Sequence, residues 1–453
     1  MEFRTVFALI IFIITYVLMF SFQRIRPHVS ITAAAVFVIA GSSGLVPGFR
    51  YTLPDALREI DWNVIMMIAG TMGTVFFFIE SKMPGRLSDM IIRRVHSVLW
   101  MVVALSLFAG IISAFVDNVA TVLMIAPVAL AICKRLRISP VPAVICISVS
   151  SNLQGAATLV GDTTSILLSK AAGLDFMDFF FTQGRPGMFW VTEAGAVAAT
   201  LIIIWMFRDN RARIDLDGHT IVEDIVPTIL LSATIVTLIL ASFIPYKDTA
   251  APGQFYKPDI TNGIICMGYF LIALVHQLLH DKDSALSLRA IRELDYYTIA
   301  LLAGLFIVIG GIQRAGIIDL IGTLLASVSG SGSRGSVFMI YTLIVWVSVL
   351  LSAFIDNIPY TATMLPVVAV ITEQLSAAGG TPVNPNLLYF GLLAGATLGG
   401  NLTPIGASAN ITAIGILRRE GHEVSPGTFM KYSVPFTLAA VATGYLLIWL
   451  IWS

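Results

Sequence analysis

The sequence predicts an all-α polytopic membrane protein with about ten transmembrane helices in two inverted repeats. Composition is the first reason: of 453 residues, 57% are hydrophobic and 12% charged, and the mean hydropathy is +0.88. Soluble domains carry about 25% charged residues. Apolar runs long enough to cross a bilayer recur along the chain, and a polar segment occurs twice inside two of its apolar stretches. The formal net charge of zero gives no indication of nucleic-acid binding.

Apolar runs of about 20 residues are the candidate spans. They lie at about 6–22, 29–46, 62–80, 142–173, 188–207, 226–245, 258–280, 297–313, 386–417 and 432–452. We expect the two longest, 142–173 and 386–417, to be discontinuous helices, because polar residues interrupt them. The first run lacks a small-residue cleavage site, so we expect it to be a retained helix.

The duplicated segment occupies residues 113–127 and 352–366, and both copies read Ser-Ala-Phe-x-Asp-Asn at their start. Each copy places an acid and an amide in the middle of an apolar stretch, at 98–134 and at 336–375. Burial of such groups in lipid costs several kcal/mol, and a polar turn is tolerated at membrane depth only where protein or water surrounds it. We therefore predict a re-entrant helical hairpin in each stretch.

Each half of the chain then holds five spans and one hairpin. An odd number of spans inverts the second copy, which is the pattern of an inverted repeat. We predict a first repeat at 1–207, a cytoplasmic linker at 208–225 and a second repeat at 226–453. With both termini outside, the inner loops hold 18 of the 27 basic residues, so charge favours this orientation in the plasma (inner) membrane.

The two discontinuous spans share a polar pattern at a spacing of 245 residues. Gly155, Thr158 and Gly161 in the first correspond to Gly400, Thr403 and Gly406 in the second. Glycine allows the backbone to leave helical geometry, and unwound backbone can offer carbonyls to cations or N–H groups to anions. Close helix packing also explains such glycines, but matched breaks in both halves favour a binding site at the membrane midplane.

The candidate solute- and ion-binding residues are the polar side chains at these four breaks. They are Asp117, Asn118, Thr121, Asn152, Thr158, Asp162, Thr163, Thr164, Ser352, Asp356, Asn357, Thr403, Ser408 and Asn410. Desolvation and mutual repulsion favour the protonated form of neighbouring acids, so Asp117 and Asp162 are the candidates for coupling. The alternative for Asp356 is an ion pair with an arginine.

These motifs resemble those of the ion transporter superfamily, on its ArsB/NhaD branch. The branch includes arsenite pumps, Na⁺/H⁺ antiporters, silicon effluxers and the melanosomal P protein. The resemblance rests on the hairpin string, on Gly161-Asp-Thr-Thr and on Gly400-Asn-Leu-Thr-Pro-Ile-Gly-Ala-Ser-Ala-Asn. It implies a homodimer whose transport parts, each holding both hairpins, move as elevators.

The resemblance also bears on the substrate. The dicarboxylate branch has Ser-Asn-Thr at both hairpin tips, whereas this chain has Asp117 and Asp356 at the serine positions. We expect proton- or Na⁺-coupled export of a small inorganic solute, first of all arsenite or antimonite. Na⁺/H⁺ antiport, with Na⁺ near Asn118, Asp162 and Asn357, is the alternative, and an anion such as a dicarboxylate comes third. No cofactor is expected, and an ATPase partner stays open.

Other classes fit less well. Gly41-Ser-Ser-Gly matches the string of a membrane serine protease, but no histidine lies in the middle of an apolar run to act as its base. A channel also needs polar rings, but matched breaks in an inverted repeat favour alternating access. The cysteines Cys133, Cys146 and Cys266 are scattered in or beside apolar runs and fit no metal or disulfide pattern. We therefore expect a transporter and not an enzyme.

Overall fold

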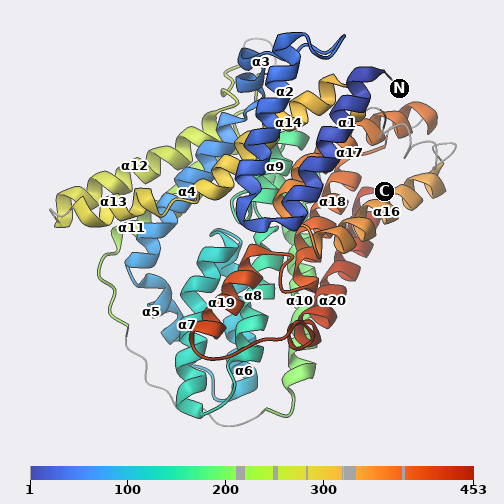
Figure 1. Ribbon diagram of the computed structural model, residues 1–453. Helices are drawn as coiled ribbons and strands as arrows, with labels where there is room; N and C mark the ends of the chain where they lie inside the picture. The colour runs from blue at the N-terminus through green and yellow to red at the C-terminus, as the bar shows by residue number, and fades with distance from the viewer. Residues whose placement is uncertain are drawn as a thin grey trace.

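The computed structural model describes residues 2–210, 220–247, 254–281, 284–318, 320, 333–379 and 383–453. Within these ranges the chain is helical except for loops and one short strand pair (Figure 1). Half of the predicted linker, residues 211–219, lies outside the described ranges.

The first half of the chain contains twelve helical segments and two strands among its described residues. In order they are α1 (Phe3–Ser21), η1 (Gln23–Ile25), α2 (Arg26–Ser43), α3 (Leu53–Glu59), α4 (Trp62–Glu80), α5 (Met83–Ile92), α6 (Val98–Ser113), α7 (Asn118–Leu136), α8 (Val141–Gly155), α9 (Thr163–Ala172), η2 (Met177–Phe179), β1 (Phe181–Thr182) and β2 (Arg185–Pro186), followed by α10 (Met188–Phe207). The two strands pair antiparallel.

The second half repeats this order of helices. It contains α11 (Val226–Ser242), α12 (Thr261–Asp281), α13 (Ser284–Arg292), α14 (Tyr296–Arg314), α16 (Arg334–Ser352), α17 (Asn357–Gly379), α18 (Pro385–Gly399), η3 (Gly400–Leu402), α19 (Ser408–Arg419) and α20 (Pro426–Trp452).

Packing follows the repeat. Helix α6 packs against α8, and its counterpart α16 packs against α18. Helix α4 packs against α12 of the other half, and its counterpart α14 packs against α2, while α10 and α20 contact each other. The prediction of an all-helical membrane protein built from two inverted repeats is confirmed. The repeat boundaries at 207 and 226 stay a prediction.

Eight described helices are long and apolar enough to cross a membrane. They are Phe3–Ser21, Trp62–Glu80, Asn118–Leu136, Met188–Phe207, Thr261–His280, Ala285–Arg314, Arg334–Ser352 and Pro426–Trp452. Two of them, α7 and α16, are arms of the predicted hairpins. The other predicted spans contain the shorter α2 and α11 and the broken pairs α8–α9 and α18–α19.

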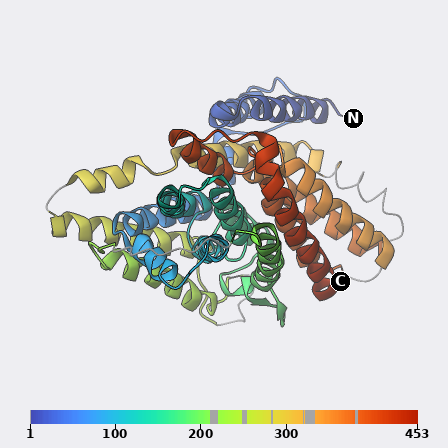
Figure 2. The ribbon, with the colours of Figure 1, turned by 90° about the horizontal axis from the view of Figure 1, so that it is seen from below.

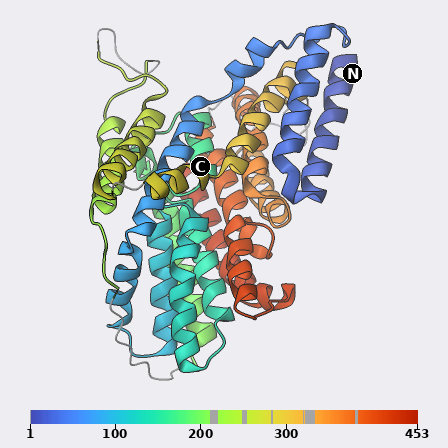
Figure 3. The same cartoon turned by 60° about the vertical axis from the view of Figure 1, so that its left-hand side comes forward.

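The N-terminal pair α1 and α2 stands apart from the first hairpin. In Figures 1 and 3 the bundle of α6, α7 and α8 lies below α1 and α2. Figure 2 shows the N-terminal pair at one edge of the molecule, away from the blue-green helices. The first hairpin and the N-terminal pair are therefore displaced from each other along the long direction of the molecule.

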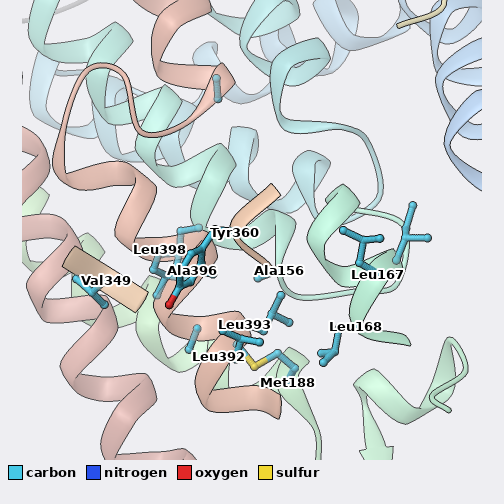
Figure 4. Close-up of a cluster of buried hydrophobic side chains, with 14 of the residues drawn as sticks. Ala156, Leu167, Leu168, Met188, Val349, Tyr360, Leu392, Leu393, Ala396 and Leu398 are labelled. Atoms are coloured by element: carbon cyan, nitrogen blue, oxygen red, sulfur yellow. The ribbon is translucent and has the colours of Figure 1, made fainter. Parts of the chain in front are cut away.

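A continuous apolar core joins the two broken helices. Side chains of α9, α10, α16, α17 and α18, among them Leu168, Met188 and Leu393, come together in it (Figure 4). Helix α8 is buried at every residue except Pro142, and α18 at every residue except Pro385. Because these helices are buried on all sides, their few polar residues lie against other protein groups and not against lipid.

Candidate functional site

Hairpin 1, made of α6 and α7, and hairpin 2, made of α16 and α17, both turn at their Asp-Asn pair. Helix α6 ends at Ser113 and α7 begins at Asn118, with the Asp117 carboxylate accepting hydrogen bonds from the N–H groups of Val119 (2.9 Å) and Ala120 (3.3 Å). An aspartate at this position satisfies orphan N–H groups and complements the helix dipole. Asp356 caps α17 in the same manner, at 3.2 Å from the N–H of Ile358.

The broken helices open where the glycines predict. Helix α8 ends at Gly155 and α9 begins at Thr163. A Cβ on Gly161 would lie 2.6 Å from the carbonyl oxygens of Gly155 and Ser113. The equivalent Gly406 has the same surroundings in the second half, where a Cβ would lie 2.6 Å from the Gly400 carbonyl oxygen. Only glycine allows each break to approach its hairpin so closely.

A cavity of about 430 Å³ lies where these breaks meet. Its lining includes the first residues of four helices: Asn118 of α7, Thr163 of α9, Asn357 of α17 and Ser408 of α19. The same cavity contacts the apolar side of α4 and the start of α14. Helix N-termini carry partial positive charge, so four of them at one place favour negative groups.

Acidic side chains supply that negative charge. Asp117, Asp162, Glu293 and Asp295 line the cavity, and none of the described lining residues is basic. Glu293 is exposed and accepts from Arg289 at 2.8 Å, while Asp295 and Asp117 are half-buried and cap α14 and α7. Asp162 is the one lining acid that is fully buried.

Asp162 is only 5% exposed and has only neutral hydrogen-bond partners. Its Oδ2 accepts from Thr164 Oγ1 at 2.6 Å and from Asn357 Nδ2 at 3.3 Å. The other two buried aspartates among the described residues each have a cation at 2.7–2.8 Å, Lys257 for Asp175 and Arg26 for Asp356. A buried carboxylate without a cation favours protonation or the binding of a positive ion.

A chain of buried hydrogen bonds joins the two hairpin tips behind the cavity. Asn118 Nδ2 donates to Asn152 Oδ1 (2.9 Å), and Asn152 Nδ2 donates to the carbonyl of Thr397 (2.8 Å). The hydroxyls of Thr397 and Thr164 lie 2.9 Å apart, and Thr164 in turn donates to Asp162. Because a hydroxyl has one hydrogen, Thr397 is the donor to Thr164. The tip of hairpin 1 is thereby linked to Asp162, which the tip of hairpin 2 also contacts.

Several candidate residues hold backbone rather than face the cavity. Thr158 donates to the Ala114 carbonyl and Thr403 to the Ala353 carbonyl, so the two hydroxyls fasten each break to the turn of its hairpin. Ser352 donates to the Ala396 carbonyl. Asn410 donates to the carbonyls of Gly400 and Thr403 and accepts from Ser148 Oγ at 2.7 Å. These residues are not among those that line the cavity, and their role in binding solute stays a prediction.

Asp356 and Thr121 also lie outside the cavity lining. The structure places Asp356 in an ion pair with Arg26, with 2.8 Å between Oδ2 and Nη1. An ion pair with an arginine is the alternative that the sequence analysis gave for Asp356, in place of a role in solute binding. Thr121 is fully buried, and its hydroxyl has no partner among the described residues.

Sequence reasoning did not identify Thr397, Asn401 or Arg26. Asn401 accepts from Asn152 Nδ2 at 3.1 Å and donates to the Val149 carbonyl at 2.9 Å. The repeat itself carried a signal for Thr397, because it follows Asn152 by the same 245 residues that relate the glycines. No comparable sequence pattern indicated Arg26, which follows the first apolar run as a basic residue of the first loop commonly does.

Among the described residues, no three His, Cys, Asp or Glu side chains form a group that could hold a metal. The predicted Na⁺ position near Asn118, Asp162 and Asn357 is a different kind of site, built from one carboxylate and neutral oxygens. All three residues line the cavity. The three cysteines are buried and do not line it.

The chain matches a family model described as a citrate transporter over residues 7–395. An uncharacterized transporter of Mycobacterium tuberculosis is 31% identical over 453 residues, which is 98% of each chain. The human P protein is 26% identical over 93% of this chain and 57% of its own length.

Two solved structures have similar folds. The YdaH transporter of Alcanivorax borkumensis, described as having an unusual topology, superposes with a TM-score of 0.58 at 16% identity, over 99% of this chain and 98% of that one. MtrF of Neisseria gonorrhoeae, described with a class of antimetabolite efflux pumps, gives a TM-score of 0.53 at 13% identity over 86% and 80%. At these identities the likeness concerns the fold.

Proposed function

Since the chain belongs to the citrate transporter family, CitMHS, and is a secondary transporter and not an enzyme, we propose that it exchanges protons for a small inorganic cation such as Na⁺ or Li⁺. The observation that carries this proposal is the buried Asp162 carboxylate, which has two neutral donors and no cationic partner among the described residues. A proton or a cation neutralises it equally, and mutually exclusive binding of the two is the basis of exchange.

The surroundings of Asp162 suit a cation without a tight chelating cage. Asn118, Thr163 and Ser408 line the same cavity and offer amide, hydroxyl and backbone oxygens near helix breaks. Asp117 adds a second carboxylate that is half-buried and held by the N–H groups of α7. We assign Asp162 to the exchange itself and Asp117 to attraction of the ion into the cavity.

An elevator movement would carry this cavity across the membrane. The displacement of the first hairpin, α6 and α7, from the N-terminal pair supports the proposal (Figures 1 and 3). In the proposed movement α1, α2 and α14 belong to a fixed part of the protein. Both hairpins move together, because the hydrogen-bond chain through Asn152 and Thr164 joins them.

Citrate, the substrate in the family's description, is the second candidate. Four helix N-termini at the cavity favour an anion. Free citrate would, however, meet four acidic lining residues and no basic one, so its binding would require that Asp117 and Asp162 be protonated. Export of arsenite or antimonite, the first expectation from the sequence, has less support, because the neutral hydroxide would find oxygen ligands and no thiol.

Everted membrane vesicles with a fluorescent pH-gradient probe test the proposal. We expect Na⁺ or Li⁺ to collapse the gradient in vesicles that contain the protein, and to have no effect with Asp162→Asn. Asp209→Asn is the matched control, since the Asp209 side chain is 91% exposed. A response to citrate or arsenite, with none to any cation, would overturn cation exchange.

A further inference from the structure

The two hairpin acids occupy equivalent places in the repeat but have different partners. Asp117 accepts only from backbone N–H groups and lines the cavity. Asp356 is 8% exposed and forms an ion pair with Arg26, which is 5% exposed. A buried pair between residues 330 positions apart in the chain is costly to desolvate, so its presence calls for an explanation other than stability alone.

Arg26 connects three elements. Its Nη1 donates to Asp356 at the start of α17, and its Nε donates to the carbonyl of Met19 near the end of α1. Arg26 is itself the first residue of α2. The hydroxyl of Tyr16 adds a second contact across the same interface, donating to the Pro359 carbonyl at 3.1 Å. Hairpin 2 is thus fastened to the N-terminal pair at two points.

The repeat identifies the position that corresponds to Arg26 in the second half. Gly304 of α14 lies against Ser30 of α2, and the equivalent Gly70 of α4 lies against Cys266 of α12. The same spacing relates Arg26 to Asn262. Asn262 is neutral, and its amide lies 3.4 Å from Asp175 in the loop that follows α9. Hairpin 1 therefore has no cation at the place where hairpin 2 has Arg26.

The cavity reflects this difference. Hairpin 1 contributes five lining residues, Asp117 to Ala120 and Leu123, whereas hairpin 2 contributes Asn357 and Ile358. One of the lining residues of hairpin 1, Leu123 of α7, is 49% exposed. In the described arrangement the cavity lies along hairpin 1, and hairpin 2 is held against α1 and α2.

We propose that the Arg26–Asp356 pair is a latch that positions hairpin 2 against the N-terminal pair, and that it opens whenever hairpin 2 uncovers the cavity. Both groups lose their partner in that step, so the latch stabilises the arrangement in which the cavity lies along hairpin 1. Among the described residues, hairpin 1 has no cation at its tip and so no equivalent latch. Arg26 is a positioning residue and does not touch the solute. The inference rests on the alternating access of the proposed function and not on its substrate.

Cysteine labelling tests the latch without any solute. In the full-length protein, with Cys133, Cys146 and Cys266 replaced by serine, Leu123→Cys reports access to the cavity along hairpin 1. Sealed vesicles are treated with a membrane-impermeant maleimide, which is added on the side of the membrane from which it reacts with Leu123→Cys. We compare the background protein with R26Q/D356N, which removes both charges and leaves no unpaired ion.

We expect the equilibrium constant between the two arrangements to shift about tenfold in R26Q/D356N, which is the effect of a loss of about 1.4 kcal/mol from one of two states, and the labelling rate to fall with it. The pair-matched control K82Q/E223Q removes an exposed ion pair, with side chains 56% and 61% exposed, and should label as the background does. The reversed pair R26D/D356R should label faster than R26Q/D356N. Equal labelling of R26Q/D356N and the control, with both proteins folded by fluorescence-detected gel filtration, would overturn the latch while leaving cation exchange untouched.

Discussion

Hairpin 1 and hairpin 2 share a sequence and a backbone but differ in electrostatics. Both turns place an aspartate before the first residue of a helix, and both breaks hold a glycine against the hairpin carbonyls. The acid of hairpin 1 faces a cavity, however, while the acid of hairpin 2 faces Arg26. The comparison indicates that the two halves share the geometry of the hairpin turns and breaks, and that residues in the surrounding elements give the two acids different partners.

A second asymmetry lies in the broken helices. Asp162 precedes α9, and the equivalent residue before α19 is Ala407. Only the first break therefore carries a carboxylate, and the amide of hairpin 2 turns to it rather than to its own half. One acid shared by both hairpins lets a single ion or proton influence the two tips together.

The largest expected effect comes from moving this acid. Asp162→Ala should reduce coupled transport at least about tenfold, because the loss of one ion ligand commonly costs about 1.4 kcal/mol or more. Adding Ala407→Asp restores the number of carboxylates at the equivalent place of the other half. We expect no rescue in the gradient assay, since Ala407 is 1% exposed and is not among the residues that line the cavity. Recovery of transport in the double variant would show that the two halves are interchangeable.

The next effect concerns the shared backbone. Gly161→Ala and Gly406→Ala each place a Cβ about as close to two carbonyl oxygens, at 2.6–2.8 Å. We expect each to destabilise the protein by about 1–3 kcal/mol through overpacking. Gly415→Ala in α19 is the control, because nothing lies within 4 Å of the added Cβ. Apparent melting temperatures in detergent provide the measurement, and a loss in one half alone would contradict a common backbone geometry.

The sequence was sufficient to predict the parts of the molecule that arise from local chemistry and from the repeat. Apolar runs predicted the helices, Asp-Asn pairs predicted the hairpin turns, and Gly155 and Gly161 predicted the first break, because each of these depends on neighbouring residues. Asp117, Asn118, Asp162 and Asn357 line the cavity, and their binding of ion or solute stays a prediction.

Long-range contacts were not predictable in this way. The pairing of Arg26 with Asp356 joins segments 330 residues apart, and no periodic pattern couples them. Helical faces also decide which polar side chains reach the cavity. Thr163 lines it, whereas Thr158 turns to the Ala114 carbonyl, and hydrophobic patterning does not separate the two in a segment that is buried on all sides.

The smallest expected effect tests how far the symmetry extends. Thr158 and Thr403 each donate to a hairpin carbonyl, and each hydroxyl also lies 3.4 Å from the N–H two residues later. Removing either hydroxyl with valine should cost about 1 kcal/mol, because a buried carbonyl loses its donor. We expect the two losses in apparent stability to agree within about 0.5 kcal/mol, and to add in the double variant, as for distant independent sites.

Thr443→Val serves as the control for these two variants. Its hydroxyl bonds the carbonyl four residues earlier in the same helix, which already has a helical partner, so a smaller loss is expected. A clearly larger cost for Thr403→Val would mean that the asymmetry reaches the backbone of hairpin 2, in addition to its charge. Equal costs would mean that the two breaks are fastened to their hairpins alike, and that the halves differ at Arg26, Asp162 and their counterparts.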